Sequence, residues 1–501
     1  MVKNSFSQRL QQFHTWGGLF FGWILFVVFF TGTLSVFAPE ISYWMRPEAK
    51  IATITHQQAL AAAQKALMQN APDADQWFVV LPQGRTKSLE VSWQKNGQKF
   101  EQYVDPQTGE FIKVRKTDGG EFFAEFHYNL HHEPLGTWIV SIAGIMMLVA
   151  LFSGIVIRKR VIRDFFHFRW RKNWLSMHTM LGVLTIPFVV LITYSGLSMT
   201  FMEIMPVSLS TFYKNEGFFW QDFLHSVERP RTKEPAMMQP LTEILPLAEG
   251  ELGDGQLAFV QVKQPNTKHA VVHFMRRVDD RMMAITDRAS FDAVTGEWLT
   301  TKNTWDGHAT IVRSLVGLHI AKFGGYPMAW LYFILGLLSC VMIASGLVFF
   351  TIKRRLLYEK TGASGNGFFR NAEKMNAAVI SGCMAASVSY FLWNRLLPSM
   401  LPGRDSGEIF MFFLTWIVML VHAFYRPAKR AWVEQFFLAG ILSYLTVLLG
   451  LCANSTSLFS AFYERDWMRG GVDFSLLLGG SVLLATAFYL QKKWQVFSRS
   501  S

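Results

Sequence analysis

The sequence predicts a membrane-embedded helical bundle of about eight transmembrane helices, with duplicated two-helix units and two small α+β domains outside the bilayer. Three observations predict this fold class: few charged residues, long apolar runs and an internal repeat. Only 17% of the 501 residues are charged, against roughly 25% in soluble domains. A helix needs about 20 residues to cross a bilayer. Apolar runs of that order occupy 16–38, 136–157, 179–202, 327–350, 376–397, 409–425, 432–452 and 474–490.

The first apolar run is expected to be a membrane anchor. It is longer than the apolar core of a cleaved signal peptide, which has about 7–15 residues. Basic residues gather beside the ends of several runs, at 158–172, 353–355, 426–430 and 492–493. This distribution is typical of the cytoplasmic ends of membrane helices. The net charge of +12 therefore indicates orientation in a lipid bilayer, with both termini in the cytoplasm, and no nucleic-acid partner.

The runs divide the chain into successive regions. These are a tail and first span at 1–38, an external domain at 39–135, two spans joined by a basic loop at 136–202, a second external domain at 203–326, a span at 327–357, and a C-terminal four-span region at 373–491.

The segments 14–157 and 178–350 follow one plan, which is the signature of a duplication. Each begins with His-Thr, at His14 and His178, and has glycine four residues later, at Gly18 and Gly182. The second spans of the two segments match at identical spacing through Trp138, Gly144 and Ser153-Gly154, and through Trp330, Gly336 and Ser345-Gly346. A Leu-His pair precedes each of these spans, and the interval from that pair to the tryptophan differs by four residues.

The two external domains also share a plan. Residues 56–112 read as a short helix followed by alternating strands, and residues 239–299 repeat that order. Both domains contain Asp-x-x-Thr-Gly-Glu, in which Gly109 and Gly296 suit the positive φ of a turn. We therefore expect two small helix-plus-antiparallel-sheet domains.

These domains resemble the PepSY domain, and their placement between His-led spans resembles the PepSY-associated transmembrane family. The resemblance covers about 1–357 and leaves 373–491 unmatched. The family includes iron-regulated inner-membrane proteins and ferric-siderophore reductases that carry haem. The resemblance implies a bacterial inner-membrane protein whose PepSY-like domains lie in the periplasm. It further implies electron transfer through two b haems to a periplasmic ferric siderophore or other ferric chelate, which then releases Fe(II).

Four histidines are the expected axial ligands of the haem irons. Repeat symmetry pairs His14 with His178 on the cytoplasmic side and His131 with His319 on the external side. Gly18 and Gly182 lie on the same helix faces as His14 and His178, and we expect them to leave room for a flat macrocycle. Ordinary interfacial histidines and close helix packing at the glycines remain the alternatives.

The outer ligand is open among three histidines in "FHYNLHHEPLG". His131 is favoured over His127 and His132, because His131 and His319 both follow leucine in the two Leu-His pairs. His127 lies on the same helix face as His131 and is the first alternate, as a ligand or as a supporting group.

The electron donor is expected to be a separate molecule, because no flavin or nicotinamide motif stands out in the chain. A cytoplasmic flavoprotein is one candidate, and a membrane quinol bound in 373–491 is the other. The residues considered for that quinol site are Trp393, Arg395, Trp416 and Tyr444. Two other functions stay open: a transporter for the siderophore or the iron, and a non-catalytic regulator whose external domains bind a peptidase or peptide.

Overall fold

The computed structural model describes residues 6–49, 54–158, 163, 174–214, 216–224, 226–361, 366–452, 463 and 465–499. The chain forms two compact units. The first, here called the helical unit, comprises Met1–Met45, Lys116–Leu197 and Trp330–Ser501. The second, here called the sheet unit, comprises Arg46–Arg115 and Ser198–Ala329.

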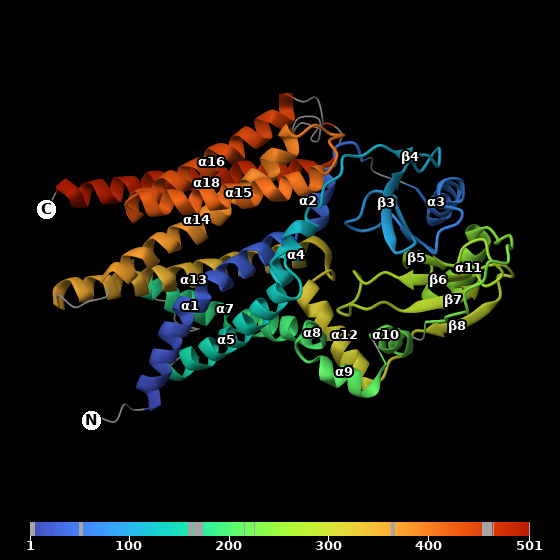
Figure 1. The fold of residues 1–501 in the computed structure, drawn as a ribbon, viewed down its shortest axis with the longest axis horizontal. Helices are drawn as coiled ribbons and strands as arrows, with labels where there is room; N and C mark the ends of the chain where they lie inside the picture. The colour runs from blue at the N-terminus through green and yellow to red at the C-terminus, as the bar shows by residue number, and fades with distance from the viewer. Residues whose placement is uncertain are drawn as a thin grey trace. The chain divides into compact units, whose positions relative to one another are not determined.

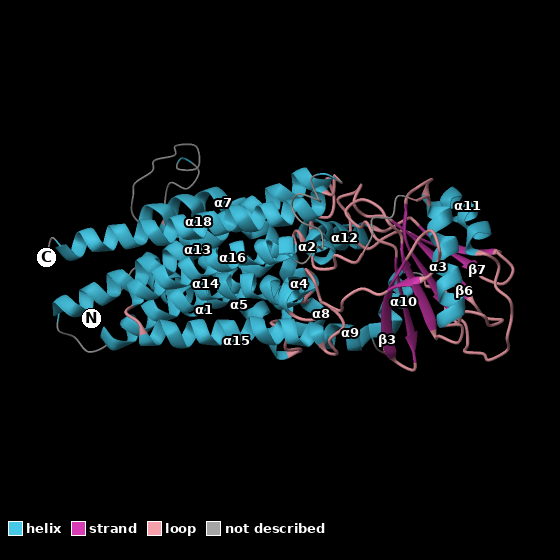
Figure 2. Cartoon of the chain, turned by 90° about the horizontal axis from the view of Figure 1, so that it is seen from above, coloured by secondary structure: helices cyan, strands magenta, loops and turns pink. Residues whose placement is uncertain are grey.

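Long apolar helices make up the helical unit. Among the described residues, eight helices are long and apolar enough to cross a bilayer, which confirms the predicted number. They are α1 (Phe6–Ser35), α5 (Leu135–Ile157), α7 (Trp174–Met199), α13 (Gly325–Thr361), α14 (Asn366–Leu396), α15 (Arg404–Tyr425), α16 (Ala428–Cys452) and α18 (Trp467–Arg499). Figures 1 and 2 show these helices running side by side. The chain is therefore a multi-pass membrane protein.

Two short helices complete the helical unit. They are α2 (Ala38–Trp44), directly after α1, and α4 (Glu121–Asn129), directly before α5. Helix α4 contacts α1 and α5, and α2 contacts α18. The external domain expected at 39–135 is therefore narrower in the structure, because residues at both of its ends belong to the helical unit.

The sheet unit is built on one antiparallel sheet rather than two. Its strands are β1 (Gln76–Val80), β2 (Glu90–Lys95), β3 (Gln98–Val104), β4 (Phe111–Ile112), β5 (Leu257–Lys263), β6 (Val271–Arg276), β7 (Arg288–Asp292) and β8 (Trp298–Lys302). Their spatial order is β4-β3-β2-β1-β5-β6-β7-β8. The first strand of each predicted domain pairs with the other, from Gln76 opposite Lys263 to Val80 opposite Phe259. The two PepSY-like halves thus share one sheet.

Burial explains why the halves join. Helices α3 (His56–Asn70) and α11 (Leu241–Leu252) contact one face of the sheet and each other. On that face Trp77 of β1 and Val262 of β5 are both fully buried in a single apolar cluster. Pairing β1 with β5 also satisfies backbone groups that would otherwise lie at two open sheet edges. Gly109 and Gly296 have φ of 69° and 76°, as the shared turn motif predicted.

The remaining helices of the sheet unit are α8 (Phe201–Ile204), α9 (Pro206–Phe212), α10 (Glu216–Leu224) and α12 (Gly307–Ile320). Helix α12 begins at an Asp306 cap, whose carboxylate accepts a hydrogen bond from the Ala309 amide at 2.7 Å. Buried Arg313 donates to Asp287 at 2.8 Å and thereby ties α12 to the start of β7.

Candidate functional site

His14 of α1 and His178 of α7 lie side by side in the helical unit. Their ring centroids are 6.1 Å apart and their ring planes differ by 66°. The two histidines are separated by 164 residues in the sequence but occupy equivalent positions in the repeat. The structure therefore brings together the pair that the repeat predicted on the cytoplasmic side.

Both rings are held by the same type of contact. The Nδ1 atom of His14 lies 2.9 Å from the carbonyl oxygen of Ala150. The Nδ1 atom of His178 lies 2.8 Å from the carbonyl oxygen of Met342, the equivalent residue of the second repeat. A carbonyl oxygen only accepts hydrogen bonds, so Nδ1 must donate and the lone pair of each neutral ring is on Nε2. That is the tautomer of a histidine that ligates a metal ion through Nε2.

A glycine lies four residues after each of these carbonyl groups. A Cβ atom on Gly154 would lie 3.3 Å from the His14 ring, and one on Gly346 would lie 2.7 Å from the His178 ring. The hydroxyl of the preceding residue, Ser153 or Ser345, bonds back to the same carbonyl oxygen at 2.9 Å. The Ser-Gly pairs that mark the repeat are thus the places where the histidine rings rest.

Gly18 and Gly182 have a different environment from Gly154 and Gly346, against which the histidine rings lie. A Cβ atom on Gly18 would meet nothing within 4 Å, and one on Gly182 would meet only Met342, at 3.9 Å. By contrast, a Cβ atom on Gly22 would lie 2.8 Å from Leu347. Close helix packing therefore does not require glycine at either position. The space at Gly18 is open, and at Gly182 a Cβ atom would make an ordinary van der Waals contact with Met342.

His127 makes the same contact from α4 that the inner histidines make. Its Nδ1 atom lies 2.7 Å from the carbonyl oxygen of Val28 in α1. Gly32 follows Val28 by four residues, and a Cβ atom on Gly32 would lie 2.6 Å from this Nδ1 atom. Thr31 corresponds to Ser153 and Ser345, and its hydroxyl donates to the carbonyl oxygens of Val27 and Val28 in α1. Burial lowers the pKa of His127 and outweighs the Val28 hydrogen bond, which raises it.

His131, the favoured outer ligand, has a different environment. Its Nε2 atom lies 3.1 Å from the carbonyl oxygen of Phe122, and its Nδ1 atom lies 3.4 Å from the Glu125 carboxylate. Both ring nitrogens therefore face oxygen atoms of the protein. His132, the other alternative, is exposed. The geometry favours His127 over His131. Like His14 and His178, His127 has its Nδ1 atom on a helix carbonyl oxygen and its ring against the glycine four residues later.

A sequence signal for His127 exists that the Leu-His alignment missed. His127 lies eleven residues before Trp138, and His319 lies eleven residues before Trp330. Counted from the tryptophans, the two histidines correspond without any gap. His319 is in the last turn of α12, in the sheet unit, and His127 is in the helical unit.

The inner pair fits a metal ion held from two sides. Two imidazoles that ligate one ion from opposite sides have ring centroids roughly 6 Å apart, since each metal–nitrogen bond is about 2 Å long and each nitrogen lies about 1 Å from its ring centroid. The observed separation of 6.1 Å agrees with this value and is also a usual separation of two rings in edge contact. The described residues contain no cluster of three or more His, Cys, Asp or Glu side chains that could hold a metal ion. Two imidazoles could hold the iron of a haem, which brings its other ligands with it.

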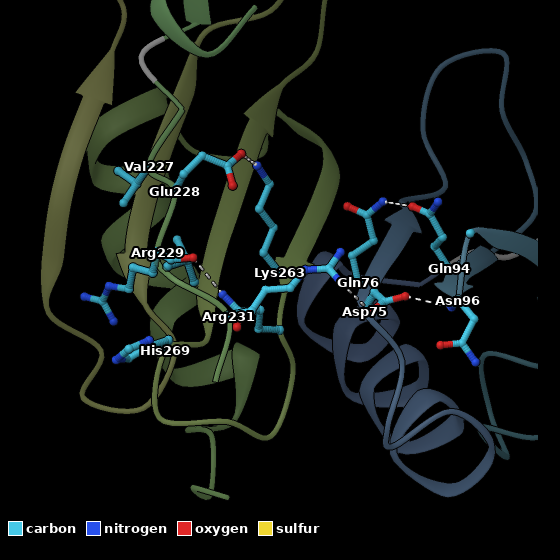
Figure 3. A pocket seen from close by; sticks show the side chains of 13 residues that line it. Asp75, Gln76, Gln94, Asn96, Val227, Glu228, Arg229, Arg231, Lys263 and His269 are labelled. Carbon is cyan, nitrogen blue, oxygen red and sulfur yellow. Dashed lines mark hydrogen bonds and ion pairs between the residues drawn. The ribbon is translucent and has the colours of Figure 1, made fainter. Parts of the chain in front are cut away.

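A polar pocket of about 380 Å³ lies in the sheet unit where the two halves of the sheet meet. Figure 3 shows Gln76, Gln94 and Asp75 on one side and Arg231 and Lys263 on the other. Lys263 is paired with Glu228, whereas the Arg231 side chain is 87% exposed and 3.7 Å from Asp75. The volume lies within the range of small-ligand sites.

Three of the four residues proposed for a quinol site, all but Trp393, have separate partners. Arg395 donates to the Trp44 carbonyl oxygen, Trp416 donates to the Ala378 carbonyl oxygen, and the Tyr444 hydroxyl bonds to Ser481. These contacts account for the three side chains through packing within the helical unit. A quinol site in 373–491 stays a prediction from the sequence.

Comparison with known families gives one match. The family described as the PepSY-associated TM region matches residues 11–354. That span includes His14, His127, His178 and His319 and ends before α14. No curated protein matches the chain.

Proposed function

The chain belongs to the PepSY-associated TM family, and from that premise we propose that it is a haem-dependent electron-transfer protein that reduces a ferric chelate. The observation that carries the proposal is the His14–His178 pair, with ring centroids 6.1 Å apart and both Nδ1 atoms bound to carbonyl oxygens. Its expected site is the bacterial inner membrane, with both termini in the cytoplasm and the sheet unit in the periplasm.

The backbone groups and glycines around the inner pair perform three tasks in this proposal. The carbonyl groups of Ala150 and Met342 orient the rings and direct Nε2 of each histidine toward the ligand. Gly154 and Gly346 let the rings approach those carbonyl groups. Gly18 and Gly182 leave space for a planar group beside the rings. A haem held by two imidazoles supplies one-electron transfer without an open coordination position for oxygen.

A second haem is proposed for the external side, with ligands drawn from the equivalent histidines. The sequence favoured His131 with His319. We now propose His127 as the ligand that the helical unit supplies, because its Nδ1 atom contacts the Val28 carbonyl oxygen of α1. His319 stays the partner predicted from the repeat, since both histidines lie eleven residues before a tryptophan. Two haems, one expected near each face of the membrane, would let electrons cross it in two steps.

The substrate in this proposal is a ferric siderophore or other ferric chelate on the periplasmic side. Reduction of Fe(III) to Fe(II) weakens its binding to oxygen ligands, because the lower charge attracts them less. The pocket lined by Arg231 and Lys263 is where we propose that a polar, anionic chelate docks. The electron donor is proposed to be a membrane quinol or a separate cytoplasmic flavoprotein.

Purification from haem-sufficient cells tests the proposal directly. The detergent-solubilised protein is expected to be red, to show sharp α and β absorption bands after dithionite reduction, and to hold about two haems per chain. His14→Ala is expected to lose about one haem. His308→Ala is the matched control, because His308 is exposed on α12, and it is expected to keep both. Stopped-flow mixing of the reduced protein with ferric siderophores then measures substrate reduction. A colourless wild-type protein would overturn the proposal.

A further inference from the structure

We infer that α14, α15, α16 and α18, the four helices outside the family match, form a bracket that fixes the position of α4 and so the direction of His127. The role of His127 as a ligand rests on the function proposed above. The support of α4 rests on contacts within the helical unit, whether or not a haem is bound.

Helix α4 cannot hold its own position. It has nine residues, and isolated helices shorter than about 12–15 residues are marginal in water. Its orientation must therefore come from what packs on each side. His127 reaches the Val28 carbonyl group of α1, and the phenylalanines of α4 form a buried apolar surface next to it.

The apolar side of α4 packs into the bracket. Phe122 and Phe123 are fully buried, and Phe126 is 3% exposed. The Phe122 ring stacks on Tyr390 of α14 at 4.4 Å and meets Phe412 of α15 at 4.9 Å. Stacked and edge-on aromatic pairs are favoured geometries that stabilise beyond the burial of their surface, so these contacts favour one orientation of α4.

The link that leads into α4 is also held by the bracket. The Thr117 hydroxyl donates to Glu408 of α15, and the Tyr390 hydroxyl donates to the Gly119 carbonyl oxygen at 3.0 Å. Glu408 is fully buried and also accepts hydrogen bonds from Asn394 and Arg404. A buried carboxylate with several hydrogen-bonded partners has one favourable geometry. Glu408 therefore fixes the position of the segment at Thr117 that leads into α4.

Helix α2 is held in the same way and crosses next to the start of α4. The Trp44 indole donates to Asp473 of α18 at 2.8 Å, and the Tyr43 hydroxyl donates to Asp466 at 3.1 Å. A Cβ atom on Gly120 would lie 2.4 Å from the backbone of Ala38. The two short helices therefore meet in direct backbone contact, and the bracket holds both.

The equivalent helix of the second repeat has a different support. On α12, Arg313 donates to Asp287 at 2.8 Å and Gly317 approaches the Met282 backbone, where a Cβ atom would lie 2.4 Å from its carbonyl oxygen. These contacts lie within the sheet unit. Helix α4 belongs to the helical unit, so the bracket does for α4 what the segment between β6 and β7 does for α12.

Hydrogen–deuterium exchange of the full chain in detergent tests the inference. Tyr390→Phe removes the bond to Gly119, and Glu408→Gln weakens the hold on Thr117. Both variants are expected to speed amide exchange in residues 121–129, by about tenfold or more for Glu408→Gln. Tyr444→Phe is the matched control, because it removes a hydroxyl hydrogen bond between α16 and α18, and it is expected to leave that exchange unchanged.

In haem-loaded protein, the two bracket variants are expected to change the electron paramagnetic resonance signal and midpoint potential of one haem and to leave those of the His14–His178 haem unchanged. Unchanged exchange in 121–129 in both bracket variants would overturn the inference. A colourless wild-type protein would overturn the proposed function but would leave the exchange result valid for α4. If Glu408→Gln speeds amide exchange throughout α1 and α5, the variant has lost more than the contact with Thr117. The exchange of residues 121–129 in Tyr390→Phe then tests the inference, because that variant removes a single hydroxyl group.

Discussion

The Nδ1 atom of His127 lies 2.7 Å from the carbonyl oxygen of Val28, and the ring rests against Gly32 one turn later. His14 and His178 repeat this relationship with Ala150 and Met342. In each case a Ser-Gly or Thr-Gly pair provides the surface on which the ring lies. A carbonyl oxygen in a helix has a second lone pair, and the missing glycine side chain lets the imidazole reach it. The three histidines therefore share one local structure despite lying on different helices.

Replacing the external histidines one at a time distinguishes the two candidates for the outer ligand. His127→Ala is expected to lose about half of the bound haem, because the seated ring is removed. His131→Ala is expected to keep both haems, because both of its ring nitrogens already face oxygen atoms of the protein. The haem-to-protein ratio from pyridine haemochrome spectra measures both variants, with His132→Ala as an exposed control. The reverse result would restore His131 as the ligand.

Substitutions at Gly18 test whether its open space is for the cofactor. Gly18→Ala is expected to fold and to keep its haem, with a gain of up to about 1 kcal/mol from the better helix propensity. Gly18→Phe is expected to lose haem while retaining its fold, because the ring would fill that space. Gly346→Ala is a useful comparison, since its Cβ atom would lie 2.7 Å from the His178 ring and should displace the histidine. Haem content and thermal unfolding report the outcomes; full haem binding by Gly18→Phe would contradict the assignment.

The buried histidine of β6 predicts a pH dependence of the stability of the sheet unit. Burial, together with the charges of Arg288 and Lys263, holds the pKa of His273 well below its usual value of 6.5. Between those two pKa values the unfolded chain binds more protons than the folded chain, so stability rises with pH. We expect the free energy of unfolding to fall below about pH 6.5, by up to about 1.4 kcal/mol per pH unit, and to be insensitive to this group above about pH 7.5.

Thermal unfolding followed by tryptophan fluorescence between pH 5 and 8 measures this effect. His273→Gln is expected to have a lower Tm at pH 7.5 and a flatter dependence on pH, because its side chain does not titrate. His308→Gln replaces an exposed histidine and is expected to keep the wild-type slope. Equal slopes for the wild type and His273→Gln would show that another group is responsible.

The polar pocket of the sheet unit predicts a charge preference for the substrate. Arg231→Glu is expected to raise the Kd for ferric citrate by up to about fivefold at low salt, since an exposed ion pair contributes up to about 1 kcal/mol. The effect should shrink as ionic strength rises. Lys99→Glu makes the same change of charge on β3, where Lys99 is paired with Glu101, and is expected to have little effect. Isothermal titration calorimetry gives the Kd values; equal affinities would move the docking site elsewhere.

Much of the architecture could be predicted because it depends on local patterns. Long apolar runs must cross a bilayer as helices, since no other single segment satisfies its own backbone groups there. Alternation and turn glycines predicted the helix-then-strands order of 56–112 and 239–299 and the positive φ of Gly109 and Gly296. The edge pairing of β1 with β5 could not be predicted, because strand pairing between distant segments leaves no periodic signal in either of them.

The outer ligand shows the same limit at the level of single residues. An alignment on Leu-His favoured His131, whereas the spacing to Trp138 and Trp330 pairs His127 with His319. Both alignments are consistent with the sequence. The choice between the two histidines depends on which imidazole ring reaches the Val28 carbonyl oxygen of α1. That depends on the position of α4 against α1.

The sequence by itself determined that this protein crosses a membrane several times, that it contains a duplicated unit, and that His14 and His178 occupy equivalent positions. Those properties follow from hydropathy, charge placement and repeat spacing. All three can be read from the order of residues without knowing which segments contact each other. Only the tertiary structure decided that the two PepSY-like halves share a sheet and that His127 rather than His131 contacts the Val28 carbonyl oxygen of α1. The packing of the C-terminal helices against α4 also became visible only there. Each of these depends on contacts between segments far apart in the chain, where burial and hydrogen-bond geometry select one arrangement among several that the sequence allows.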